Sequence, residues 1–409
     1  MFATLRKYFS PFIIQDEELS FLQIFKPLYV LLFAFGLFPQ AVEFRDGKQN
    51  SKLALKPTRI NWACTLLIIF MVHTFLVVHL LELSVARKDY IVTEDEMTAA
   101  NYIFDLIMQA LFCTVSYFRV IRDRRLYIAI LNGMADCWDR LAKVERKVDR
   151  ILGRLRVQIN CVVICSVIAT TLLLNAVTYT GEFGIWKLVL VGLTFVLPEM
   201  IQFAMIAFYF AMILMLVALL KNIEEQFKNV LRVRNTVQYG SYDPDYGFNI
   251  SMAEIRHVYV KTMRIKRLIN GAFQAPILVL LLVSFHELVG LPHMIYHGLT
   301  FKSNFAMHEI VEDSFWVFNQ LLKIFALAHS GTLLNSQVNK IGLAIHRIPT
   351  TGYHDLKIFL QVQHFSSLMA FENADITVYG YFSLEVTLMF NVVASAVTYL
   401  IIMIQFDKK

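Results

Sequence analysis

Five residues near the C-terminus lie on one side of an otherwise apolar segment, and four of them are polar. These residues are Asn391, Ser395, Thr398, Ile402 and Gln405. Their steps of four, three, four and three keep them on one helix face at 3.6 residues per turn. An unpaired polar side chain in hydrocarbon costs free energy, so this face is expected to contact water or protein. Several copies around an axis would make it the wall of a pore, whereas the simpler alternative is a helix-to-helix contact.

A second group of polar and aromatic side chains falls in the outer halves of predicted membrane spans. We expect it to line a wet, outward-opening cavity that binds a small molecule. It comprises Tyr102, Asp105, Tyr179, Gln202, Trp316, Asn319 and Gln320. Acidic and amide groups at this depth are costly unless paired or hydrated, and aromatic rings suit small-molecule pockets. Taken singly, each residue has the plainer role of an interhelical hydrogen bond, or of an interface anchor for Tyr and Trp.

The sequence shows no pattern that indicates catalysis or a cofactor. It contains no Gly-rich phosphate loop, no HExxH, no nucleophile elbow and no His and acid cluster at ligand spacing. His286 and Glu287 adjoin, but neighbours on a helix point to different faces, so we do not expect an acid–base pair. Cys161 and Cys165 share a helix face without a His or carboxylate, which favours packing. We therefore expect no enzyme, no catalytic residue, no metal site and no cofactor.

Transmembrane helices are the elements that must position these groups. Apolar residues make up 57% of the 409 residues and charged residues 17%, whereas about a quarter of a soluble domain is charged. We predict an all-α, polytopic membrane protein in one domain, 1–409, with seven spans long enough to cross a bilayer. The spans are placed at about 61–85, 98–121, 157–180, 186–220, 270–296, 310–335 and 380–406. The apolar stretch 24–43 is interrupted by Lys26, Pro27, Gly36 and Pro39, which indicates a re-entrant or interfacial segment.

Basic residues lie in alternate loops, which predicts the orientation of the spans. They are frequent in 1–60 and in the loops after the second and fourth spans, and rare in 86–97, 181–185 and 297–309. The positive-inside rule then predicts a cytoplasmic N-terminus and, after seven crossings, an extracellular C-terminus. The net charge of +6 follows from this topology, so no nucleic-acid partner is expected. A G-protein-coupled receptor would have the opposite orientation.

The cytoplasmic loops themselves have helical periodicity. Residues 123–156 place apolar side chains at spacings of three and four, which predicts an amphipathic helix continuous with the third span. The same pattern occurs in 218–236 and 251–269, and 354–374 forms a further cytoplasmic helix. Their apolar faces must be buried against other helices, away from water. We therefore expect a cytoplasmic anchor bundle through which subunits associate.

The residues Thr398-Tyr399, five apolar residues, and Gln405-Phe406 resemble the C-terminal signature of insect gustatory receptors, relatives of the odorant receptors. The resemblance implies a tetrameric, ligand-gated, non-selective cation channel whose last helices line one pore. It places Gln405 and Phe406 at the outer constriction, with Thr398 and Tyr399 two turns deeper. Leu400 stands where sugar-sensing members tend to have an acid, which leaves bitter, fructose-like or other subfamilies.

The resemblance also implies the partners and the location. The expected partners are a small-molecule tastant, monovalent cations with calcium as a further candidate, the lipid bilayer, and related subunits in a homo- or heterotetramer. The expected location is the plasma membrane. The alternative is a secondary transporter of a small polar solute, but the two halves of the chain show no repeated pattern and no paired Gly/Pro-broken helices.

Overall fold

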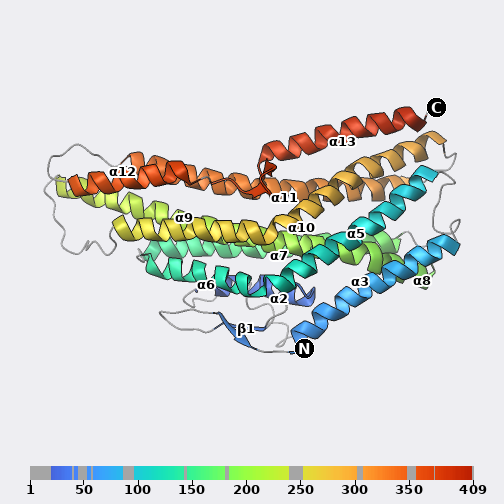
Figure 1. Ribbon diagram of the computed structural model, residues 1–409, viewed down its shortest axis with the longest axis horizontal. Helices are drawn as coiled ribbons and strands as arrows, with labels where there is room; N and C mark the ends of the chain where they lie inside the picture. Colours follow the sequence, from blue (N-terminus) through green and yellow to red (C-terminus); the bar gives the residue numbers. More distant parts are fainter. Residues whose placement is uncertain are drawn as a thin grey trace.

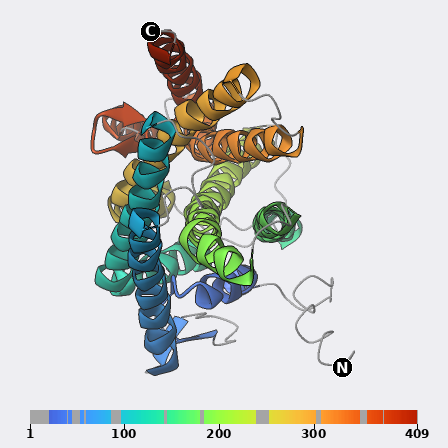
Figure 2. The same ribbon diagram turned by 90° about the vertical axis from the view of Figure 1, so that its right-hand side faces the viewer.

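The computed structural model shows an elongated helical molecule (Figure 1). It describes residues 20–38, 41–44, 53–56, 59–85, 96–141, 145–179, 184–238, 252–301, 307–347, 356–372 and 374–407. Most helices run roughly along the longest axis, and the C-terminal helix lies on the outside of the right-hand half of the molecule in Figure 1 (Figures 1 and 2).

A long helix overlaps each of the predicted spans. They are α3 (Arg59–Val85), α5 (Glu96–Arg122), α7 (Glu145–Tyr179), α8 (Ile185–Val191) with α9 (Leu197–Gln238), α10 (Met252–Phe301), α11 (Met307–His346) and α13 (Val386–Asp407). Within the described residues, six segments are long and apolar enough to cross a membrane. Helix α11 is the seventh predicted span and is not one of these six.

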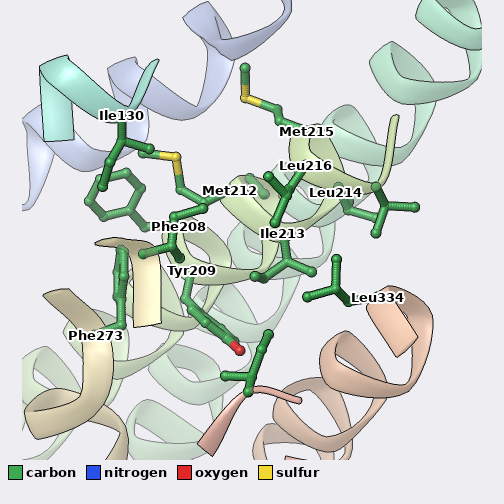
Figure 3. Packing of buried hydrophobic residues seen from close by; sticks show 14 of the residues in the cluster. Ile130, Phe208, Tyr209, Met212, Ile213, Leu214, Met215, Leu216, Phe273 and Leu334 are labelled. Carbon is green, nitrogen blue, oxygen red and sulfur yellow. The ribbon is translucent and has the colours of Figure 1, made fainter. Parts of the chain in front are cut away.

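Helix α9 forms the centre of the molecule because it is apolar on nearly all sides. Of its most apolar stretch, 94% is buried. Its Phe208 meets Phe273 of α10 with ring centroids 5.1 Å apart, and Tyr209 meets the same ring at 5.5 Å. Figure 3 shows this packing, with Leu334 of α11 on another side of α9. Helices α5, α7, α10 and α11 therefore pack around α9.

The prediction of one continuous helix over 123–156 is wrong. Helix α6 (Arg124–Arg140) ends where Leu141 adopts an extended conformation, and α7 begins at Glu145. Helix α6 continues away from α5, and α7 runs back in the opposite direction, packed against α9 (Figure 1). Lys261 of α10 donates a hydrogen bond to Asp136 of α6, which holds the pKa of that carboxyl below its usual range. Both segments have the same helical period, so periodicity does not reveal the reversal between them.

The segment 24–43 is too short a helix to span a membrane, as predicted. A 3-10 turn (Gln23–Phe25) leads into α2 (Lys26–Ala34), and nine residues extend only about 14 Å. Strands β1 (Ala41–Phe44) and β2 (Leu53–Lys56) then pair antiparallel. Gly36, with φ of +65°, lies so close to α3 that a Cβ there would be 2.9 Å from Thr65 Cα.

The last span begins later than predicted. Residues 380–385 are not helical, because the short antiparallel strands β3 (Thr377–Val378) and β4 (Phe382–Ser383) form a hairpin before α13. Gly380 in its turn has φ of +75°. Helix α12 (Leu356–Phe371) precedes the hairpin and lies within the predicted range 354–374.

Replacing Gly331 by alanine should destabilise the protein by about 1–3 kcal/mol, because backbone would have to move to admit the methyl group. A Cβ at Gly331 of α11 would lie 1.8 Å from the carbonyl oxygen of Leu384. The measurement is the melting temperature of the detergent-solubilised protein. Gly342→Ala on the same helix is the control, since its Cβ would meet only Met369 Cε at 3.7 Å. Equal melting temperatures of the Gly331→Ala and Gly342→Ala variants would contradict the expectation.

Candidate ligand and pore sites

Four helices bring seven polar side chains together in the interior of the membrane-spanning region. This central polar network consists of Gln109 of α5, Glu199 and Gln202 of α9, Ser284 and Glu287 of α10, and Gln320 and Lys323 of α11, all buried. Each lies on an otherwise apolar helix, and the helices converge so that these polar faces meet. Burial of so many polar groups is tolerated only when they are hydrogen-bonded to one another.

An ion pair lies at the heart of the network. Lys323 Nζ is 2.6 Å from Glu199 Oε2 and 2.7 Å from Gln202 Oε1, and both charged side chains are fully buried. The ammonium also lies 5.5 Å from the centre of the Phe203 ring. A buried ammonium requires such partners, because an uncompensated charge in a low-dielectric interior is very costly.

The second carboxylate is held by amides. Gln109 Nε2 lies 3.1 Å from Glu199 Oε1 and 2.9 Å from Glu287 Oε1. Gln320 donates to Glu287 Oε2 and accepts a 3.0 Å hydrogen bond from Ser284 Oγ. All four carboxylate oxygens therefore accept hydrogen bonds, yet the network contains two carboxylates and a single ammonium. Among the described residues, no group of His, Cys, Asp and Glu has the arrangement of a metal site.

A smaller polar cluster joins α3, α5 and the segment before α9. His79 Nδ1 lies 2.9 Å from Thr194 Oγ1, and its Nε2 lies 3.1 Å from Tyr102 Oη. Thr194 belongs to a π-helical turn (Gly192–Val196) that ends two residues before Pro198. Proline has no N–H and its ring crowds the preceding turn, which accounts for the local widening. Such π turns are frequent at functional sites.

The predicted ligand residues are divided among these features. Gln202 and Gln320 belong to the central polar network, and Tyr102 belongs to the His79 cluster. Asp105 Oδ1 lies 2.9 Å from His286 Nε2. Since Glu287 points into the network instead, the prediction that His286 and Glu287 face apart is confirmed.

Three further predicted residues complete the set. Asn319 donates a 2.9 Å hydrogen bond to the carbonyl of Phe315 on its own helix, and Trp316 packs against the small apolar cluster of Ala169, Val196 and Phe203. The side chain of Tyr179 lies outside the described residues. Glu199, Glu287 and Lys323 are not among the seven residues predicted to line the pocket, although a charged residue inside an apolar segment is itself a signal of function.

The C-terminal helix α13 is the most exposed of the spans. Only 6% of its apolar stretch is buried, with Ala396 and Leu388 on the covered side. The exposed residues include the whole described stripe, namely Asn391, Ser395, Thr398, Ile402 and Gln405. Val397 and Tyr399 are exposed as well, so exposure in one chain does not single out the stripe. The side chain of Phe406 lies outside the described residues.

Comparison with known proteins adds the family and the fold. A family model described as 7tm chemosensory receptor matches residues 25–409. No curated protein matches the chain. The insect olfactory receptor OR5 from Machilis hrabei in complex with eugenol is similar in structure, with a TM-score of 0.73 and 12% identity over 95% of this chain and 100% of that chain. Another structure of that receptor has a TM-score of 0.70 and 12% identity over 99% of both chains. Identity this low shows the fold alone.

Proposed function

Because the chain belongs to the 7tm chemosensory receptor family, we propose that it is a gustatory receptor acting as a ligand-gated, non-selective cation channel. The observation that carries the proposal is the pattern Thr398-Tyr399, five apolar residues, Gln405-Phe406 on a helix whose polar face is exposed in the single chain. Lipid offers no hydrogen-bond partners to the polar side chains of that face. Four copies around a common axis would surround the face with water and partner helices. The family is one of receptors and not of enzymes.

The agonist is a small molecule that binds beside the central polar network, in a pocket open to the outer side. Its residues are those predicted from the sequence, namely Tyr102, Asp105, Tyr179, Gln202, Trp316, Asn319 and Gln320. The eugenol complex of the Machilis receptor is an example of a small ligand on this fold. Buried hydrogen-bonding groups reject analogues that leave them unpaired, which favours a polar or amphipathic tastant.

The test is whole-cell current in cells that express the chain without a partner subunit, during a screen of small-molecule tastants. A cation current that requires both the chain and the compound supports the proposal.

The orientation of the chain in the plasma membrane is tested with tags on intact cells. An N-terminal tag should be hidden and a C-terminal tag accessible. Access to the N-terminal tag would contradict the orientation.

Replacing Tyr102 by phenylalanine should raise the half-activating concentration of the tastant about tenfold or more, because its hydroxyl contacts His79 in the proposed outer pocket. Surface expression should not change. The measurement is a dose–response curve of the current. Tyr127→Phe on α6 is a matched control, because this buried tyrosine packs near Phe208, away from the proposed pocket. An unchanged curve for Tyr102→Phe and Asn319→Ala would place the pocket elsewhere.

The tetramer is held together at the end of the molecule formed by α12, α11 and the N-terminal part of α10. Apolar side chains are exposed there, with 40% of Phe359, 54% of Leu360 and 59% of Leu343 accessible in one chain. Such exposure is typical of a surface that a partner covers. Phe365 differs from them, since it is buried against Phe227 and Tyr259 and belongs to the core of the subunit.

Phe359→Asp combined with Leu360→Asp should convert most of the tetramer to smaller species on native gels, because two charges would be buried in the interface. Ala129→Asp, at an exposed position of α6, should leave the assembly unchanged. Phe365→Asp should instead reduce the yield of folded protein. A normal tetramer in the double variant would refute assembly through α12.

A further inference from the structure

Asn335 of α11 connects the two ends of the hairpin that precedes α13. Its Nδ2 donates hydrogen bonds to Asp375 Oδ1 at 2.7 Å and to Glu385 Oε1 at 2.9 Å. Asp375 lies just before β3, and Glu385 is the last residue before α13. A single amide therefore holds two carboxylates that would otherwise repel one another.

Helix α10 holds the same hairpin through its backbone. Lys266 Nζ donates to the carbonyl of Asp375 at 3.1 Å, and Gln274 Nε2 donates to the carbonyl of Thr377 at 3.3 Å. Lys266 and Gln274 are eight residues apart and so share a helix face. Both interactions are directed to main-chain atoms, which fixes the path of the hairpin independently of its side chains.

Apolar contacts complete the attachment. Ile376, Val378 and Leu384 of the hairpin are almost fully buried, and the Leu384 amide donates a 2.8 Å hydrogen bond to the carbonyl of Ile376. The absence of a side chain at Gly331 lets the Leu384 carbonyl lie directly against α11. The hairpin is thus held by polar, apolar and steric contacts, whereas the apolar stretch of α13 beyond it is 6% buried.

We propose that Lys266, Gln274, Gly331 and Asn335 form a clamp that sets the position of α13 and transmits movements of α10 and α11 to it. The same two helices carry Glu287, Gln320 and Lys323 of the central polar network. From Lys323 to Asn335, α11 extends about 18 Å, a distance over which a helix is stiff. A ligand that shifts the outer halves of α10 and α11 would move the hairpin, and with it the pore helix. The transmission rests on the proposed channel function.

Asn335→Asp tests the clamp, because it places a third carboxylate beside Asp375 and Glu385 without changing the size of the side chain. Hydrogen exchange of the full-length protein in lipid nanodiscs is measured by mass spectrometry. Amides of 376–385 and of the first turns of α13 should exchange about tenfold faster. Asn339→Asp is the matched control, since Asn339 is exposed one turn further along α11. The amides of the Asn339→Asp variant should exchange as fast as those of the parent chain.

Asn335→Asp combined with Asp375→Asn should slow the exchange again in part, because it returns an amide–carboxylate pair between positions 335 and 375 while Glu385 still lacks its donor. Unchanged exchange in Asn335→Asp would overturn the clamp, as would faster exchange in the hairpin without any change in α13.

Cells expressing Asn335→Asp should also show a raised ligand-independent cation current. Faster exchange with a parental current would overturn the transmission. If the parent, Asn335→Asp and Gln405→Ala all lack current under every tastant, the channel function fails while the exchange result still judges the clamp.

Discussion

Lys323→Met should lower the free energy of unfolding by about 3–5 kcal/mol, because it leaves the Glu199 carboxylate buried without its counter-ion. Gln202 Oε1 would also lose the donor that lies 2.7 Å away. Methionine has a similar length, so the change removes the charge and little volume. The measurement is the fraction of monodisperse receptor that survives heating, followed by fluorescence-detected size-exclusion chromatography.

Two further variants make this result specific. Lys228→Met removes a lysine whose 2.6 Å ion pair with Glu224 of the same helix is partly exposed, so it should cost less than about 1 kcal/mol. Glu199→Gln combined with Lys323→Met should recover most of the stability, since a buried ion pair replaced by neutral groups is often tolerated. If Lys323→Met survives heating as well as Lys228→Met, the buried ion pair does not hold the four helices together.

Cysteines at positions 391, 395, 398, 402 and 405 should react with water-borne thiol reagents about tenfold or more faster than cysteines at positions 397 and 401. Val397 and Ile401 are exposed in the single chain, at 49% and 50%, and the stripe residues are exposed as well. The cysteine thiolate is the nucleophile that attacks the reagent, and it forms readily in water and not in lipid. In the proposed tetramer only the stripe contacts water. The measurement is the rate at which current changes after the reagent is applied.

The parent chain is the control, because its exposed Cys161 and Cys165 on α7 set the background rate. A cysteine at position 396 should react slowly, since Ala396 is 3% exposed and faces its own subunit. Equal rates at stripe and non-stripe positions would mean that the stripe joins helices and does not line a pore. Gln405→Ala provides an independent readout, since loss of the outer constriction should produce ligand-independent leak.

The long apolar helices were predictable because length and apolarity are properties of a local stretch of sequence. The helix α13 and its polar stripe follow from the same local information, since the 3.6-residue period determines which side chains share a face. The failure at 123–156 has the same origin. A helical period continues across a reversal of the chain, so it did not reveal that α6 ends at Arg140 and α7 begins at Glu145.

The partners of each polar side chain were decided only by the tertiary structure. Gln109 and Glu287 are 178 residues apart in the sequence, yet their side chains meet at 2.9 Å. Periodicity gives the face on which a residue lies, but not which helices are neighbours or how each is rotated. For the same reason the sequence does not show that Phe365 of α12 packs inside the subunit while Phe359 of the same helix is exposed. The rotation of each helix follows from how α5, α9, α10 and α11 pack together, and that packing depends on contacts between residues distant in the sequence.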